Sequence, residues 1–376
     1  MAFTTTTGAN GVVSLVGTSG VDADLAIVYS SNVYIDAKEA NDLIGLATQT
    51  GQTFVTGYTV IGGQGSDQIS NATQATVGST IWGDFIDGDT VGSGDDVITL
   101  GVTQNTTVLG LGGIDLITTK TTQGSDINGN EGADVLTIGS TFVSDTEVTS
   151  STDIVTDSFI RGGKGADTIN VDAALLLSNH INGNKDNDLI NVTVYGTGLT
   201  TSTTVYGGQG SDVISVGGEG TSATGFVVFG DLGNDSISGS NRKDSIDGGE
   251  GDDKITGEQG VDKLTGGLGK DTFAQFAGDS AAQTATGTDA AARPTITFGK
   301  GIDVITDSTV DDTITYTAGL VTTTIKTGIV GLTSGTWDGA NNVFTVNPFG
   351  SDYHYGDPTT TNSFIILGQI AAPAAV

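Results

Sequence analysis

The sequence of 376 residues contains no cysteine and only two histidines. The absence of cysteine excludes disulfides, thiolate chemistry and Cys-ligated zinc, and two histidines leave little room for imidazole chemistry. Basic residues are also scarce: 13 Lys and Arg stand against 44 Asp and Glu, for a formal net charge of −31. Such an acidic chain is repelled by nucleic acids and by anionic membranes, so we expect neither as a partner.

Long apolar runs are missing as well. No stretch approaches the roughly 20 apolar residues that a transmembrane helix needs, so the sequence predicts no transmembrane segment. The first residues, MAFTTTTGANG, lack the charged and apolar regions of a secretory signal. If the chain is exported, we expect the export machinery to read a signal other than its N-terminus.

Glycine, by contrast, is abundant. The chain holds 59 glycines, about 16% of its residues against a usual level of about 7%. Hydrophobic residues make up 36% of the chain and are spread evenly along it. This composition argues against both an ordinary packed globule and a disordered chain, and it predicts a thin, elongated core.

An internal repeat organises the chain. From residue 230 to 273 the sequence reads as nonapeptides in one register: GDLGNDSIS, GSNRKDSID, GGEGDDKIT, GEQGVDKLT and the start of a fifth, GGLGKDTF. Each unit opens with glycine, carries aspartate at position six and has an apolar residue at position eight. The aspartates are Asp235, Asp244, Asp253, Asp262 and Asp271.

The same signature recurs upstream at wider intervals, as in GGQGSDQI and GGKGADTI. These copies add Asp67, Asp96, Asp115, Asp134, Asp167, Asp188 and Asp212. Two nonapeptides, about 18 residues, make one coil of a parallel β-roll, and Asp96, Asp115 and Asp134 lie 19 residues apart. We therefore expect one row of turns along residues 61–228 and two facing rows along residues 229–275.

The residue types explain what such turns bind. Glycines at positions one, two and four allow positive φ and bring carbonyl groups inward, and the aspartate adds a carboxylate. Carbonyl and carboxylate oxygens suit Ca²⁺, whereas Mg²⁺ demands a tighter octahedron. Besides the twelve aspartates, the candidate turn residues are Gly63, Gly65, Gly163, Gly165, Gly208, Gly210, Gly249 and Gly251.

Bound calcium would also change the charge of the chain. Twelve Ca²⁺ ions, one for each aspartate, would bring a charge of +24 against −31 and leave about −7. We therefore expect a chain that is largely unfolded at the low Ca²⁺ of the cytosol and folds outside the cell.

These nonapeptides resemble those of the repeats-in-toxin (RTX) family, GGxGxDxUx, where U is apolar. The resemblance implies an all-β, parallel β-roll or β-solenoid with calcium-binding turns, expanded coils in the N-terminal half and a β-rich C-terminal cap. Degenerate copies are expected at AKEANDLI, with Asp42, and at FGKGIDVITD, with Asp303 and then Asp312. Arg242 and Asp186 replace the position-four glycine, so the sites at Asp244 and Asp188 are expected to be empty or altered.

The resemblance further implies type I secretion with an uncleaved C-terminal signal, and residues 321–376, which carry few charges, are similar in kind. A merely apolar closing strand is the alternative for this segment. We expect four segments: an N-terminal β-rich cap (1–60), expanded coils (61–228), the tandem nonapeptide β-roll (229–275) and a C-terminal β cap with the secretion signal (276–376).

Other candidate residues are less informative. In WGDFIDGDTVGSGDD, the residues Asp84, Asp87, Asp89, Asp95 and Asp96 could form an extra ion site or a solvated acidic loop. The two histidines, His180 and His354, are isolated, and the segment Tyr353 to Tyr355 is a contact patch or an aromatic closure of the solenoid. Neither HExxH nor GxSxG occurs, so we expect no enzyme.

The resulting hypothesis is a secreted, calcium-dependent structural protein. It resembles RTX-type surface-layer proteins, and we expect it to assemble with itself into a surface layer or an extracellular fibre, with cell-surface polysaccharide and the type I secretion machinery as further partners. An adhesin or carbohydrate-binding module is the alternative, followed by a hydrolase with an unfamiliar site.

Overall fold

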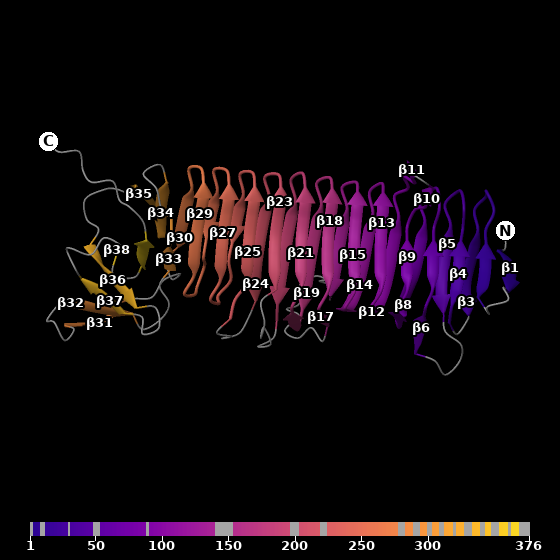
Figure 1. The fold of residues 1–376 in the computed structure, drawn as a ribbon, viewed down its shortest axis with the longest axis horizontal. Helices are drawn as coiled ribbons and strands as arrows, with labels where there is room; N and C mark the ends of the chain where they lie inside the picture. The colour runs from indigo at the N-terminus through magenta and orange to yellow at the C-terminus, as the bar shows by residue number, and fades with distance from the viewer. Residues whose placement is uncertain are drawn as a thin grey trace. The chain divides into compact units, whose positions relative to one another are not determined.

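The structure of the chain is a computed structural model (Figure 1). The described residues are 3–7, 12–28, 31–47, 53–87, 90–139, 153–195, 203–218, 224–276, 283–288, 294–298, 303–307, 312–318, 321–326, 333–338, 343–346, 353–359 and 362–367. Within these ranges all regular structure is β, and no helix is long and apolar enough to cross a membrane. The contacts divide the chain into unit 1, Met1–Thr203, and unit 2, Thr204–Val376, and each is described by itself.

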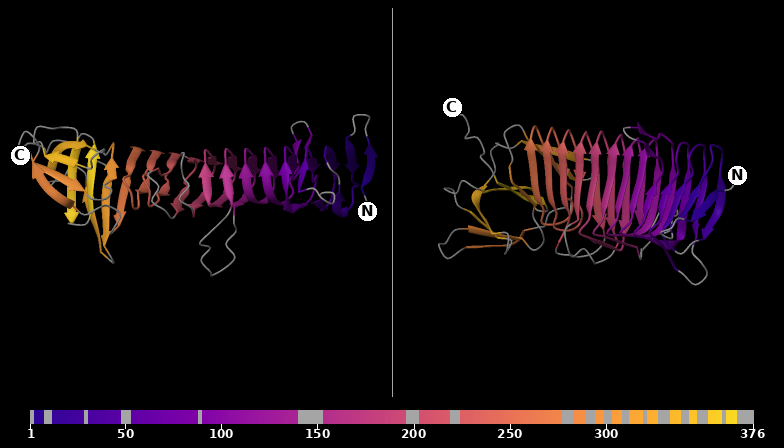
Figure 2. Two further views of the ribbon diagram at one scale, coloured as in Figure 1. Left: turned by 90° about the horizontal axis from the view of Figure 1, so that it is seen from below. Right: turned by 45° about the vertical axis from the view of Figure 1, so that its right-hand side comes forward.

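Unit 1 is a parallel β-solenoid whose coils each give one strand to each of two sheets. In the first sheet, strands β2, β4, β7 and β9 pair in parallel, as do β9, β13, β15, β18 and β21. Figure 2 shows strands of successive coils lying side by side. The strands of the first sheet are β1 (Thr4–Thr7), which is antiparallel to β2, β2 (Val13–Val16), β4 (Val33–Asp36), β7 (Thr59–Ile61), β9 (Thr80–Trp82), β13 (Thr107–Gly112), β15 (Asp126–Glu131), β18 (Phe159–Lys164) and β21 (His180–Lys185).

The second sheet of unit 1 follows the same order of coils. Each glycine-rich turn leads from a strand of the first sheet into a strand of the second, for example from β7 to β8. The strands are β3 (Ala23–Val28), β5 (Leu43–Ala47), β8 (Gln68–Val77), β12 (Val97–Gln104), β14 (Leu116–Gln123), β16 (Val135–Gly139), β19 (Thr168–Ala173) and β22 (Leu189–Val194), with β6 (Phe54–Thr56), β17 (Ile154–Thr156) and β20 (Leu175–Leu177) beside them and the hairpin β10 (Ile86–Asp87) and β11 (Thr90–Val91).

The core of unit 1 is a narrow stack of aliphatic side chains between the two sheets. The apolar residue two before each opening glycine faces inward, and so does the apolar residue at position eight. Ile160 pairs with Ile181 in one sheet and Ile169 with Ile190 in the other, and all four are fully buried. Each coil therefore adds only a few apolar side chains to the core, as the composition predicts.

Unit 2 has the same construction with shorter coils. In the tandem nonapeptides, equivalent residues are 18 apart, as in the pairing of Ser245 with Lys263. The turns alternate between the two edges, which confirms two facing rows in this segment. The strands are β23 (Thr204–Gln209), β25 (Val227–Leu232), β27 (Ser245–Glu250), β29 (Lys263–Leu268) and β33 (Asp303–Ile305) in one sheet, and β24 (Val213–Gly218), β26 (Ser236–Ser238), β28 (Lys254–Thr256), β30 (Thr272–Phe276) and β34 (Thr313–Ala318) in the other.

The last part of unit 2 is β-rich, with mainly antiparallel pairing. It is tied to the coils by β33, which pairs in parallel with both β29 and β39. The fold class expected from the sequence is therefore confirmed. The strands are β31 (Gln283–Thr288), β32 (Pro294–Phe298), β35 (Val321–Lys326), β36 (Thr333–Asp338), β37 (Val343–Val346), β38 (Tyr353–Thr359) and β39 (Asn362–Leu367).

Candidate metal-binding turns

The motif aspartates of unit 1 stack in one row along an edge of the solenoid. The backbone N–H of each aspartate donates to Oδ1 of the equivalent aspartate in the next coil, at 2.8 Å from Asp96 to Asp115 and from Asp115 to Asp134. The row comprises Asp22, Asp42, Asp67, Asp96, Asp115, Asp134, Asp167 and Asp188. All of these side chains are buried. The expected degenerate copy at Asp42 thus occupies a regular place in the row.

Unit 2 holds two such rows on opposite edges. One contains Asp212, Asp235, Asp253, Asp271 and Asp312, and the other contains Asp244, Asp262 and Asp303. Asp271 donates to Asp312 at 2.9 Å although the two are 41 residues apart. The two degenerate aspartates predicted after the tandem repeats therefore cap the rows.

The second carboxylate oxygen of most of these aspartates is buried without a hydrogen bond. This holds for Oδ2 of Asp42, Asp67, Asp96, Asp115, Asp134, Asp167, Asp235, Asp253 and Asp262. Because an unpaired buried acceptor costs roughly 1–3 kcal/mol, and more when it is charged, a whole row of them needs a partner. A cation is the partner that an anionic oxygen prefers.

Main-chain oxygens lie beside these orphaned atoms. A Cβ added to Gly110, the opening glycine of its turn, would lie 2.1 Å from Oδ2 of Asp115 and 2.7 Å from the carbonyl oxygen of Gly129. Only glycine fits there, and it leaves a carboxylate and a carbonyl of the next coil facing the same small space. In the described residues no three His, Cys, Asp or Glu side chains converge on one point. The ligands of a cation would therefore be main-chain carbonyls with one or two carboxylates, a hard oxygen set that suits Ca²⁺.

The glycines at positions two and four have the predicted backbone form. Gly163 and Gly165 have φ of 129° and 121°, and a Cβ on Gly163 would lie 2.0 Å from the carbonyl oxygen of Asn130. Positive φ also occurs at Gly63, Gly65, Gly208, Gly210, Gly249 and Gly251. The turn at Asp188 keeps this form with Asn184 and Asp186 at φ of 79° and 73°.

Burial of the aspartates raises their pKa strongly. Loss of hydration is the largest cause, the N–H donor from the preceding coil lowers the pKa in part, and neighbouring carboxylates raise it again. The pKa reaches about 8 for Asp96 and Asp115 and about 7 for Asp67 and Asp167. Burial, followed by the charge of Asp303, also raises the pKa of Asp262. A divalent cation beside these carboxylates would favour their charged form and so lower their pKa again.

In two turns, Oδ2 of the aspartate is hydrogen-bonded by a residue of the same turn. We call these turns closed, and we call a turn open where Oδ2 has no hydrogen bond. Thr18 and Ser240 stand at position two, and their backbone N–H groups donate to Oδ2 of Asp22 and Asp244, both at 2.6 Å. Their hydroxyls also donate to the same oxygens, at 3.2 and 2.9 Å. Asp244 is thus the altered site that the sequence predicts, but Ser240 closes it, whereas the sequence pointed to Arg242. A hydroxyl residue at position two is the signal that could have identified both turns.

The turn that leads to Asp96 opens earlier than its sequence suggests. A Cβ on Gly83 would lie 2.1 Å from Oδ2 of Asp96, so Gly83 is its opening glycine, and the chain after Asp84 is an insertion. Asp84 is buried and accepts N–H bonds from Gly94 and Gly112 at 3.1 and 3.3 Å. Asp84 therefore belongs to the turn and not to a solvated loop. Asp89 lies outside the described residues.

The histidines and the late tyrosines lie apart from these rows. His180, half-buried in β21, packs against Phe159 with ring centroids 5.6 Å apart. His354 belongs to β38, together with Tyr353 and Tyr355, and pairs with Ile366. His180 thus belongs to unit 1 and His354 to unit 2.

The fold and the turns define the class: a parallel β-solenoid with cation-binding, glycine-rich turns. Comparison with known families agrees, because the model of the RTX calcium-binding nonapeptide repeat (4 copies) matches residues 157–173, 197–219 and 238–273. The chain therefore contains RTX-type repeats, and such repeats bind calcium. No curated protein matches the chain. The structure extends the same turn to Asp42, Asp67, Asp96 and their neighbours, which lie outside the matched segments.

The open and closed turns differ in a way that calcium counting can test. We expect Asp253→Ala to lower the number of Ca²⁺ ions bound at saturation by at least one, because Oδ2 of Asp253 is open. Asp244→Ala should leave the number of bound Ca²⁺ ions unchanged, because the backbone N–H and the hydroxyl of Ser240 already donate to the Asp244 carboxylate. Metal analysis after equilibrium dialysis measures both, and an equal loss in the two variants would contradict this distinction.

Proposed function

We propose that the protein is a secreted structural protein that folds on extracellular Ca²⁺ and assembles with itself into a surface layer or a fibre. The observation that carries this proposal is the extent of the solenoid, since stacked aspartate turns form the body of both units instead of a small appendage. RTX-repeat proteins are typically exported by type I secretion. We propose that the export signal lies within residues 321–376, of which 321–326, 333–338, 343–346, 353–359 and 362–367 are described.

Self-assembly needs surfaces that a second copy can cover. Unit 1 offers an exposed apolar row beside its turns: Ile114 is 58% exposed and Leu116 41%. Leu116 pairs with Val97 in one neighbouring strand and with Val135 in the other, so the row runs from coil to coil. The edge strand β1 adds four exposed threonines. Exposed apolar rows and strand edges are the features through which solenoids associate.

A substitution that places one charge on the exposed apolar row can test assembly without disturbing the fold. We expect wild-type protein to form filaments or lattices on calcium addition, seen by light scattering and electron microscopy. Leu116→Lys should slow or abolish assembly while the calcium-induced circular dichroism stays intact, because the side chain is outward-facing. Ser215→Lys on β24, also exposed, brings the same charge elsewhere and should assemble like wild type. Wild-type protein that stays monomeric in calcium would contradict the proposal.

We further propose that the chain has no catalytic activity. The buried carboxylates of the rows are engaged by backbone N–H groups of the neighbouring coils, and His180 packs against a phenylalanine. This arrangement supports a structural role of the acidic residues in the coils.

A further inference from the structure

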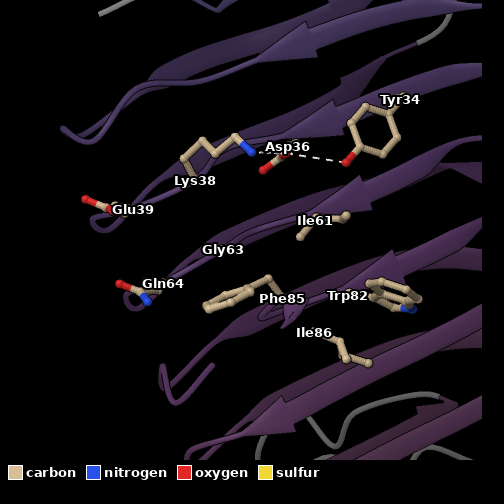
Figure 3. A pocket seen from close by; sticks show the side chains of 10 residues that line it. All are labelled: Tyr34, Asp36, Lys38, Glu39, Ile61, Gly63, Gln64, Trp82, Phe85 and Ile86. Atoms are coloured by element: carbon tan, nitrogen blue, oxygen red, sulfur yellow. Dashed lines mark hydrogen bonds and ion pairs between the residues drawn. The ribbon is translucent and has the colours of Figure 1, made fainter. Parts of the chain in front are cut away.

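A groove lies on the outer face of the first coils of unit 1, and none of the aspartates of the row lines it. Strands β4, β7 and β9 place Asp36, Ile61 and Trp82 in one cross-strand row, and Tyr34 lies two residues before Asp36 on the same outward face. The groove has a volume of about 480 Å³ (Figure 3), within the range of small-molecule sites.

The insertion after Asp84 forms one wall of this groove. The hairpin of β10 and β11 sets Phe85 and Ile86 at the groove, and Ile86 is 47% exposed. In Figure 3 Phe85 lies between Trp82 and Gln64. The turn closes around Asp96 with the same hydrogen bonds as its neighbours, so the insertion is not needed to build the cation site. Its structural effect is to enclose the groove.

The polar groups of the groove are nearly balanced in charge. The Tyr34 hydroxyl donates to Oδ2 of Asp36 at 3.4 Å, and the Lys38 ammonium pairs with the same oxygen at 2.5 Å. Glu39 and Gln64 lie at the turn end, where their backbones form a bridge, and both are exposed. The groove therefore combines aromatic rings with hydroxyl, carboxylate and amide groups and carries a charge of about −1.

We propose that this groove binds a neutral carbohydrate chain. The C–H faces of sugar rings pack on aromatic side chains, and their hydroxyls bond to carboxylate and amide groups such as those of Glu39 and Gln64. An anionic polymer would be repelled by the acidic chain. A cationic ligand would find only one uncompensated carboxylate, because Lys38 already pairs with Asp36. This proposal is independent of self-assembly.

Calcium and carbohydrate should be linked through the turns. Lys38 and Glu39 belong to the turn that ends at Asp42, and Gly63 and Gln64 to the turn that ends at Asp67. Oδ2 of both aspartates is open. Calcium that orders these two turns would fix the wall of the groove without touching the sugar, so we expect binding only in the calcium-loaded chain.

The test is calorimetric titration of the full chain in millimolar Ca²⁺ with maltohexaose, cellohexaose, chitohexaose and mannohexaose. We expect at least one to bind, with affinity lowered at least about tenfold by Trp82→Ala and several-fold by Gln64→Ala, an exposed position that leaves the fold intact. Phe229→Ala, which removes an outer aromatic ring stacked 5.1 Å from Tyr206 in unit 2, should bind like wild type.

Three results would overturn the proposal. These are binding of none of the four sugars, binding that both groove variants retain, and binding of tetramethylammonium in place of sugar, which would make the groove a cation site. Light scattering in calcium on the same samples shows whether assembly is affected, so failure of the carbohydrate proposal can be told apart from failure of the structural one.

Discussion

In calcium-depleted buffer at pH 8, we expect the protein to lose most of its β-sheet circular dichroism, and we expect millimolar Ca²⁺ to restore it. The physical reason is the set of buried Oδ2 atoms without a hydrogen bond, such as those of Asp115 and Asp134, which leave each row with unpaired acceptors when no cation is present. The net charge of −31 adds repulsion throughout the chain.

The size of the effect follows from mass action. With affinities of about 10⁻³ M, typical of extracellular modules, about 10 mM Ca²⁺ stabilises each site by roughly 1.4 kcal/mol. About ten sites then contribute on the order of 14 kcal/mol, as much as the whole stability of a typical domain. The narrow aliphatic core offers little to replace this contribution.

A second divalent cation serves as the control. Mg²⁺ at the same concentration should restore much less signal, because the turns supply flexible carbonyl ligands and Mg²⁺ requires a tight octahedron. A β-sheet signal that remains unchanged after calcium removal at pH 8 would show that the core alone holds the coils together, and it would contradict a stabilising role of the cation.

Much of this fold could be predicted from the sequence because the repeat carries its own geometry. A spacing of 18 residues predicts two facing rows, and the coils around Ser245 and Lys263 have them. The inward-facing residues follow from position eight and from the residue two before each opening glycine. Even the degenerate copies could be predicted, since Asp303 and Asp312 each keep an apolar residue two positions after the aspartate.

The remaining features depend on contacts between coils that repeat spacing does not reveal. To predict that Thr18 or Ser240 closes its turn, one must know the distance from position two to the carboxylate, and a consensus sequence does not contain this distance. The groove needs Tyr34, Ile61 and Trp82 on adjacent strands, although 27 and 21 residues separate them in the sequence. In expanded coils of unequal length, such cross-strand neighbours become known only from the register.

The pH dependence of folding should reverse with calcium. An aspartate in the unfolded chain ionises near pH 4, whereas burial raises the pKa of Asp96 and Asp115 to about 8 in the metal-free fold. Between these values the folded chain holds protons that the unfolded chain has lost. The free energy of unfolding therefore falls as the pH rises from 4 to 8, and acidification to pH 5 should stabilise the metal-free chain. With Ca²⁺ present, protons compete with the cation, so the gain in stability from calcium should shrink as the pH falls over the same interval.

Asp115→Asn tests this reversal at a single position. The amide resembles the protonated carboxyl and keeps an oxygen that can accept the N–H of Asp96. In calcium-depleted buffer at pH 8 the variant should keep more β-sheet circular dichroism than wild type, because a buried charge is gone. In saturating Ca²⁺ it should melt at a lower temperature than wild type, because a ligand is gone. The corresponding Asp244→Asn variant, in a turn that Ser240 already closes, should be destabilised with and without calcium alike. If Asp115→Asn changed the stability of the fold in the same direction under both conditions, the carboxylates of the rows would owe their burial to something other than a bound cation.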